Sequence, residues 1–277
     1  MRPDSLSFRL LEWYGTHLKH PGQWRVHAAL RSLLGPPADV DLPVKRQGNA
    51  WVLNPADFPQ VDLFWLGESD RWDLHHARKR LRPGAVIFDV GANFGYYSVM
   101  LASGLRGACE VHAFEPAPET FARLCRHIAL NRLTSVHPHR IGLSDSPALG
   151  ALRPREGNSG AAYLVPGGEI EISTLDRFVE ERGLKRLDFI KIDVEGLEER
   201  VLRGGRKTLA RFRPMVLIEI QPITLERAGS SVAAVVALLT SLGYTLMQAR
   251  RRTLVPLQVR DEPGWLVNAF CLPPGTA

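Results

Sequence analysis

Three carboxylates and a lysine stand in or directly after two apolar runs in the second half of the chain. Lys191, Asp193 and Glu195 belong to the first run and the residues after it, and Glu219 lies near the end of the second. Carboxylates whose pKa is raised by burial and by one another can act as general bases. We therefore predict that Asp193 or Glu195 removes a proton from a hydroxyl, and that Lys191 and Glu219 hold this arrangement by pairing. The alternative is structural: Glu195 would cap the following helix, and Lys191 and Glu219 would form only an internal ion pair.

Two metal interpretations compete with the acid–base one. The same carboxylates could ligate Mg²⁺, which prefers oxygen ligands, but their spacing does not demand it. His75-His76 and the pair of His137 and His139 could also bind a metal, yet no cysteine or third histidine joins either pair in the sequence. We expect surface positions for both pairs and no bound metal, with His75 or His76 as a minor candidate for the base.

A turn rich in glycine follows the apolar stretch that begins at residue 85. Asp89 ends the stretch, and Gly91 and Gly95 enclose Ala92 and Asn93. Glycine lets the backbone bend tightly and approach a ligand closely, and a helix after the turn would direct its first N–H groups at that ligand. The turn therefore predicts a site for a nucleotide-type cofactor, with Asp89 and Asn93 bonding its polar groups. It lacks the second glycine of the dinucleotide fingerprint, which disfavours an NAD-linked enzyme.

Two later strand ends offer further cofactor contacts. Glu115, followed by Pro116, stands 20 residues after Gly95, close to the spacing at which an acidic residue binds ribose hydroxyls. Ser144 and Asp145 follow the next strand, where Asp145 is placed to meet the amino group of an adenine. Asp145 equally fits a simple turn.

These residues require a framework of alternating strands and helices, which the chain shows from about residue 82 onward. The predicted strands cover about 85–89, 110–114, 136–141, 187–192, 214–220, 244–249 and 265–271. The predicted helices cover about 97–103, 118–131, 175–182 and 230–242, and a further helix follows the strand at 187–192 and ends near 204–205. Such alternation indicates an α/β fold with a doubly wound, mostly parallel sheet. The segment 144–172 reads as an irregular insertion or hairpin, in which 158–160 predicts a turn that could close over an acceptor.

Residues 1–60 form a predicted helical extension, and residues 61–277 the main domain. Leu6, Leu10, Tyr14 and Leu18 recur at four-residue steps and predict the apolar face of a first helix. A second predicted helix, 24–34, ends at a Gly-Pro-Pro breaker. Five of the six tryptophans precede residue 82, so this segment either packs on the main domain or serves as a lid or part of an acceptor pocket.

Several of these motifs together resemble a known family. The strings DVGANFGYYS (89–98), FEP (114–116), STLD (173–176), DFIKIDVEGLEERVLRG (188–204) and VLIEI (216–220) are similar, in order and spacing, to the FkbM family of S-adenosylmethionine-dependent methyltransferases. The resemblance spans about residues 60–272. It implies the class I, Rossmann-like fold, a seven-stranded sheet with an antiparallel last strand. It also implies O-methylation of a sugar, glycan or secondary metabolite, with the methionine part of the cofactor against Gly91–Gly95 and the ribose on Glu115.

Composition limits the alternatives. The net charge of +6 arises from scattered basic residues, which form ordinary solvated faces or attract an anionic partner such as an acidic glycan or phosphorylated substrate. They are not interleaved with aromatics, which disfavours nucleic acid. No apolar run is long enough to span a bilayer, and three cysteines make no disulfide framework, so we expect a cytoplasmic protein. A nitrogen or protein acceptor and a non-catalytic binding module remain as alternatives, and the oligomeric state stays open.

Overall fold

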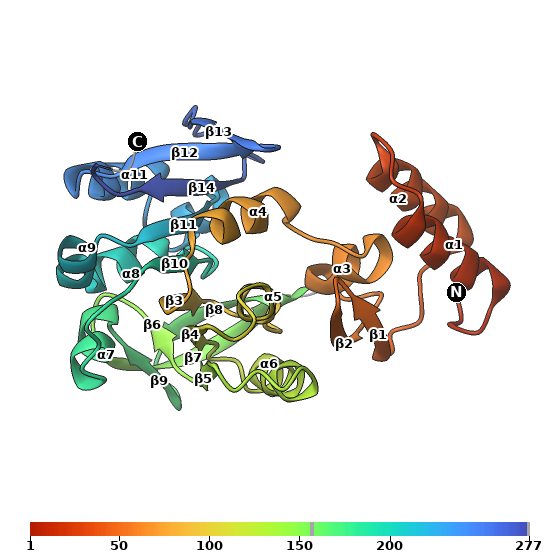
Figure 1. The fold of residues 1–277 in the computed structure, drawn as a ribbon, viewed down its shortest axis with the longest axis horizontal. Helices are drawn as coiled ribbons and strands as arrows, with labels where there is room; N and C mark the ends of the chain where they lie inside the picture. Colours follow the sequence, from red (N-terminus) through yellow and green to blue (C-terminus); the bar gives the residue numbers. More distant parts are fainter. Residues whose placement is uncertain (156–157, 276–277) are drawn as a thin grey trace. The chain divides into compact units, whose positions relative to one another are not determined.

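The computed structural model describes residues 1–155 and 158–275. The chain forms two compact units, the first consisting mainly of residues 1–71 and the second mainly of residues 72–275. Figure 1 shows the elements of both. Among the described residues, no helix is long and apolar enough to cross a membrane.

The first unit combines short helices with a β-hairpin. Its elements are α1 (Leu6–His17), α2 (Gln23–Leu34), β1 (Leu42–Arg46), β2 (Asn49–Leu53), the 3-10 helix η1 (Phe58–Gln60) and α3 (Val61–Leu66). The two predicted helices are present. The antiparallel hairpin of β1 and β2 was not predicted; its two-residue turn has positive φ at Gln47 (50°) and Gly48 (80°), as a type I′ turn requires. The lid role of residues 1–60 stays a prediction.

The buried face of α1 differs from the predicted one. Leu6 and Leu10 are exposed, whereas Phe8, Leu11 and Gly15 are buried. The Phe8 ring packs against the Trp65 ring at a tilt of 56°, with ring centroids 4.7 Å apart. A Cβ on Gly15 would lie 2.1 Å from the Trp65 carbonyl oxygen. The helix carries two possible apolar stripes, and close packing against Trp65 selects the stripe that contains the small residue.

The second unit is built on an eight-stranded sheet in the order β13-β12-β14-β11-β10-β3-β4-β5. In this sheet the neighbouring strands β5, β4, β3, β10 and β11 are parallel, and β14 is antiparallel to β11. Its elements are α4 (Arg71–Arg80), β3 (Ala85–Val90), α5 (Tyr96–Gly104), β4 (Cys109–Phe114), α6 (Pro118–Leu130), β5 (Val136–His139), α7 (Leu175–Glu181), β10 (Phe189–Ile192), α8 (Glu198–Gly204), α9 (Arg206–Phe212), β11 (Met215–Ile220), α10 (Pro222–Arg227), α11 (Val232–Ser241), β12 (Thr245–Arg250), β13 (Thr253–Pro256) and β14 (Val267–Leu272).

This topology confirms the predicted doubly wound α/β fold with an antiparallel last strand. Helices α7 to α11 cover the face formed by the even-numbered residues of β3, β10 and β11, and α5 and α6 pack against β4 and β5. Every residue of β3 is buried, as a sheet covered on both faces requires. Asp89, Lys191 and Glu219 lie at odd positions of their strands and therefore share the opposite face.

The structure departs from the prediction in several places. An eighth strand, β13, pairs with the outer side of β12, and the helices α4, α9 and α10 were not predicted. The segment after β5 belongs to a second, four-stranded sheet of β6 (Gly142–Leu143), β9 (Ile170–Ser173), β7 (Ala148–Arg155) and β8 (Asn158–Pro166). The predicted turn at 158–160 is therefore wrong, because these residues begin β8, whose later residues Tyr163 and Val165 favour a strand.

Candidate active site

The turn after β3 is held by its neighbours on both sides. The N–H groups of Gly91 and Ala92 donate to the Phe114 carbonyl oxygen at 3.0 and 2.9 Å. Gly91 has φ 78°, and a Cβ at this position would lie 1.8 Å from the carbonyl oxygen of Asp193. The glycine is thus required by the contact between this turn and the turn after β10, a reason that the sequence did not reveal.

Asp89 is buried and only half satisfied. Its Oδ2 accepts hydrogen bonds from the Ser98 N–H at 3.0 Å and the Ser98 hydroxyl at 2.6 Å. Its Oδ1 is buried and has no hydrogen-bond partner among the described residues. Burial raises the pKa of Asp89, and the positive charge of Lys191 opposes that shift. A buried acceptor without a partner costs about 1–3 kcal/mol, so this oxygen is suited to a ligand that donates a hydrogen bond.

Asn93 and Gly95 complete the turn. Asn93 has φ 51°, and its side-chain oxygen accepts from the Phe94 N–H at 2.7 Å. Gly95 has φ 94° and caps the N-terminus of α5. A Cβ on Gly95 would approach the end of the Leu124 side chain to 2.6 Å, so left-handed backbone and close packing both favour glycine here.

Glu115 is anchored to the same turn. Its two carboxylate oxygens accept from the Asn93 N–H at 2.9 Å and from the Ala117 N–H, just after Pro116, at 2.8 Å. Burial raises the pKa of Glu115 to about 7, although both hydrogen bonds lower it. Each oxygen keeps a second lone pair, so the predicted ribose contact stays compatible with these bonds.

Ser144 and Asp145 form a separate small turn. The buried Ser144 donates its N–H to the Ser173 carbonyl oxygen at 2.9 Å. The exposed Asp145 accepts from the hydroxyls of Ser144 and Ser146 at 3.2 and 3.4 Å. These are contacts of a turn-forming residue; the adenine contact stays a prediction.

Lys191 connects the two turns. Its Nζ lies 2.9 Å from Oδ2 of Asp193, 3.2 Å from the carbonyl oxygen of Gly91 and 5.3 Å from the centre of the Tyr97 ring. Burial by itself lowers the pKa of Lys191, but the charges of Asp193 and Asp89 raise it above the ordinary value. Lys191 therefore stays protonated at neutral pH.

The predicted pairing of Lys191 with Glu219 is wrong, since the ion pair of Lys191 is with Asp193. The strand register explains this result: Lys191 lies opposite Leu217, and Glu219 lies two residues further along β11. The charge of Asp193, burial and the charge of Glu195 raise the pKa of Glu219 to about 9. Glu219 therefore carries a proton at neutral pH.

Glu198 is a residue of this site that the sequence reasoning missed. Its Oε1 accepts from the N–H groups of Val194 and Gly196 at 3.0 and 3.1 Å, which holds the turn after β10. Burial raises the pKa of Glu198 to about 7. Leu197 is the N-cap of α8, which has no side-chain cap, so the alternative role of Glu195 as the cap is wrong. Glu195 has φ 53°. The role of Glu198 could have been inferred from its position three residues after Glu195, because a glutamate at this spacing resembles the second half of a capping box.

The expected surface positions hold for His75 and His137, which are exposed, but not for His76 and His139. His76 is buried, and its Nε2 lies 2.8 Å from the Arg251 carbonyl oxygen, so it is not a surface residue. His139 is half-buried and shares a ring-nitrogen contact of 3.0 Å with His112. The described residues contain no cluster of three or more histidine, cysteine, aspartate or glutamate side chains that could hold a metal ion.

Lys191 unites Gly91 and Asp193 through direct hydrogen bonds. Asp89 lies opposite Lys191 in the sheet, and Glu115 accepts from the Asn93 N–H of the same turn. Glu219 is linked to this site through its pKa, which the charges of Asp193 and Glu195 raise. Asp145 stands on its own turn.

Comparison with known proteins agrees with this arrangement. The Methyltransferase FkbM domain family matches residues 89–246. The chain is 32% identical over 214 residues to 31-O-demethyl-FK506 methyltransferase FkbM of Streptomyces tacrolimicus, which covers 65% of this chain and 79% of that protein. It is 32% identical over 138 residues to hexuronic acid methyltransferase AglP of Haloferax volcanii (49% and 55%). It is 28% identical over 153 residues to 2-O-methyltransferase NoeI of Sinorhizobium fredii (48% and 62%).

The chain therefore spans less than two thirds of the second and third of these relatives. The family match nevertheless covers more than half of this chain and includes the turns after β3 and β10. With the strand order of the sheet, these findings show that the chain belongs to the FkbM family of S-adenosylmethionine-dependent methyltransferases.

Proposed function

We propose that this chain transfers a methyl group from S-adenosylmethionine to a hydroxyl of a sugar, glycan or secondary metabolite. The observation that carries the proposal is the ion pair of Lys191 and Asp193 against the Gly91 carbonyl oxygen. It fixes a carboxylate beside the turn that the cofactor is expected to occupy. Two relatives support a hydroxyl acceptor, since their names describe an O-demethyl substrate and a 2-O position. A third is named for a hexuronic acid, which supports a sugar acceptor.

The chain offers suitable partners for the cofactor. The unpartnered Oδ1 of Asp89 fits a group with N–H donors, such as the amino end of the methionine part. The free lone pairs of Glu115 fit the ribose hydroxyls. When bound, S-adenosylmethionine supplies an electrophilic methyl group on a positively charged sulfur.

The carboxylates divide the acid–base work. Glu219 already holds a proton at neutral pH because its pKa is raised to about 9, so it is a poor base. Asp193 or Glu195 accepts the proton of the acceptor hydroxyl while the hydroxyl oxygen bonds to the methyl carbon and the carbon–sulfur bond breaks. The side chain of Asp193 is 34% exposed, so an acceptor can reach it. Lys191 acts as a positioning residue, because it fixes one carboxylate oxygen and leaves the other for the substrate.

Two measurements test the proposal. Calorimetry with S-adenosylmethionine and S-adenosylhomocysteine should show binding that Asp89→Asn weakens, because an amide nitrogen at the unpartnered position would repel a donor. Transfer of a labelled methyl group should then occur to hydroxyl acceptors in a panel of sugars, glycans and polyketides. Binding without transfer to any hydroxyl, together with transfer to an amine, would contradict the O-methyl assignment.

A further inference from the structure

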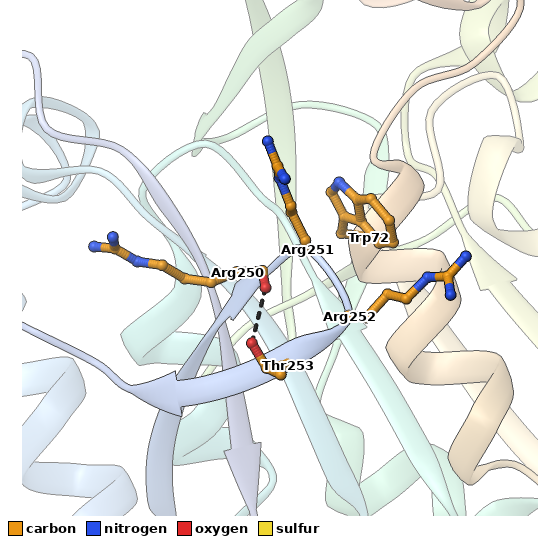
Figure 2. A pocket seen from close by; sticks show the side chains of 5 residues that line it. All are labelled: Trp72, Arg250, Arg251, Arg252 and Thr253. Carbon is orange, nitrogen blue, oxygen red and sulfur yellow. Dashed lines mark hydrogen bonds between the residues drawn. The ribbon is translucent and has the colours of Figure 1, made fainter. Parts of the chain in front are cut away.

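Three consecutive arginines and a tryptophan line an open pocket in the second unit. The pocket has a volume of about 520 Å³ and is lined by Trp72, Arg250, Arg251, Arg252 and Thr253. This volume is typical of small-molecule sites. Figure 2 shows that the side chains of Arg251 and Arg252 leave the hairpin on the side of the Trp72 ring, whereas Arg250 points away from it.

The strand register places this pocket at the same edge of the sheet as the candidate active site. Gln248 of β12 and Ile218 of β11 both lie opposite Ala269 of β14, and β12 and β11 run in the same direction. The turn after β12 therefore emerges at the carboxyl edge, as Glu219 does. Two strand steps separate β12 from β11, which is about 10 Å at the usual strand spacing. In open α/β sheets ligands bind beyond this edge.

Direct contacts fix the pocket relative to that edge. Asn268 lies opposite Glu219 in the sheet, and its side-chain nitrogen donates to Oδ2 of Asp73 at 2.9 Å. Asp73 follows Trp72 in α4, so this hydrogen bond fixes the start of that helix. On the other side, the His76 ring donates from Nε2 to the Arg251 carbonyl oxygen at 2.8 Å. Helix α4 is thus joined both to the hairpin and to β14, the strand that pairs with the one carrying Glu219.

The positive charges of the pocket favour an anionic ligand. All three arginines are exposed, and among the described residues none of their guanidinium groups forms an ion pair or hydrogen bond. Neighbouring like charges repel, and guanidinium groups bind carboxylate or phosphate with two parallel hydrogen bonds. The indole of Trp72 adds a flat apolar surface of the kind that packs on a sugar ring.

We propose that this pocket is the subsite for an anionic group of the methyl acceptor, a carboxylate or a phosphate on a sugar or similar small molecule. The inference rests on the proposed methyl transfer, because it places the hydroxyl near Asp193 and Glu195 and the anionic group between Arg251, Arg252 and Trp72. The ligand is bound without any covalent step in the pocket.

The first test measures binding without catalysis. The indole N–H resonance of Trp72, assigned with Trp72→Phe, should shift when methyl glucuronide or glucose 1-phosphate is added to the full chain. Methyl glucoside, which lacks the anion, should leave it unchanged. If methyl glucuronide binds more tightly, the pocket prefers a carboxylate; if glucose 1-phosphate binds more tightly, it prefers a phosphate. Loss of two charge-assisted hydrogen bonds in R251Q/R252Q should weaken binding about tenfold or more.

Matched variants separate the pocket from net charge. K185Q/K207Q removes two positive charges at exposed lysines outside the pocket and should leave the response intact. R251K/R252K keeps the charges but loses the two-pronged geometry, so it should bind with intermediate strength. The inference is overturned if the neutral glucoside gives the same shift, if R251Q/R252Q binds like the unmodified protein, or if the anions give no shift at tens of millimolar.

The second test measures methyl transfer to paired acceptors with and without the anionic group. R251Q/R252Q should raise KM for the anionic acceptor about tenfold with little change in kcat, and should not alter the neutral one. Transfer that ignores both the anion and the two arginines would overturn the anion subsite and leave the proposed function standing. Anion binding at Trp72 with no transfer to any acceptor would instead overturn the proposed function.

Discussion

The Nζ of Lys191 lies 2.9 Å from Oδ2 of Asp193 and donates at the same time to the Gly91 carbonyl oxygen at 3.2 Å. One ammonium group therefore links the end of β10 to the turn after β3. Lys191 is buried and Asp193 is partly exposed. The ammonium group is therefore held inside the protein, whereas the carboxylate is accessible from solvent. An acceptor can thus reach the carboxylate while the lysine keeps the two turns together.

Replacement of the proposed base should affect chemistry more than binding. Asp193→Asn keeps the shape of the side chain but removes the proton acceptor, so kcat should fall about 10²–10⁴-fold if Asp193 is the base. Glu195→Gln should show that loss if Glu195 is the base. Labelled-methyl assays give kcat, and calorimetry should find cofactor affinity within a few-fold of the unmodified protein. If neither variant lowers kcat, no carboxylate base acts at this position.

The contact between the two turns should not tolerate a methyl group at Gly91. A Cβ there would meet the Asp193 carbonyl oxygen at 1.8 Å, and φ is 78°. Gly183→Ala is a matched control, because Gly183 has φ 60° and a Cβ added to it would have no atom within 4 Å. Strained φ costs about 1–2 kcal/mol in both variants, so Gly91→Ala should lose distinctly more unfolding free energy and most cofactor affinity. Equal losses in urea denaturation would contradict the contact.

Glu219 should make stability depend on pH. Its folded pKa of about 9 lies above its ordinary value of 4.5, so the folded chain binds more protons than the unfolded chain between these pH values. Its contribution to stability is complete below about pH 4.5 and is lost as the pH rises through 9.

Glu219→Gln should remove this part of the pH dependence, because glutamine stays neutral. The variant should gain at least about 1 kcal/mol relative to the unmodified protein between pH 5 and pH 9, the free energy of one pKa unit. Denaturation curves at both pH values measure it, with Glu226→Gln on an exposed helix residue as the control. A parallel pH profile for Glu219→Gln and the unmodified protein would refute the raised pKa.

Glu198 should stabilise the turn that carries Asp193 and Glu195. Glu198→Ala leaves the N–H groups of Val194 and Gly196 without their acceptor, which should cost about 2–6 kcal/mol at about 1–3 kcal/mol per group. Glu198→Gln keeps an acceptor oxygen and should recover most of the loss. Thermal unfolding tests the stability, and kcat should fall with Glu198→Ala because the turn positions the proposed base. Identical melting of both variants with the unmodified protein would exclude the role.

The local patterns of the chain were sufficient for the first two helices and for the main strands of the large sheet with most of their helices, but not for the β1–β2 hairpin, β13 or the four-stranded sheet. The apolar run of β3, the glycines after it and the Thr174 cap of α7, whose hydroxyl oxygen accepts from the Arg177 N–H at 3.1 Å, are properties of neighbouring residues. Local spacing sets backbone conformation and side-chain period, and parallel strands bring their carboxyl ends to one edge. Asp89, Glu115, Asp193 and Glu219 could therefore be assigned to that edge from the sequence.

Only the tertiary structure decided how these residues are paired. The strand register places Lys191 opposite Leu217 rather than Glu219, so Lys191 pairs with Asp193, two residues further along its own chain segment. Packing against Trp65 selects Phe8 over Leu10 on α1, and a hydrogen bond to the Arg251 carbonyl oxygen brings His76 inside. These pairings and buried positions depend on packing between segments far apart in the chain. A local sequence pattern does not specify which of several suitable residues will lie next to a given side chain in the fold.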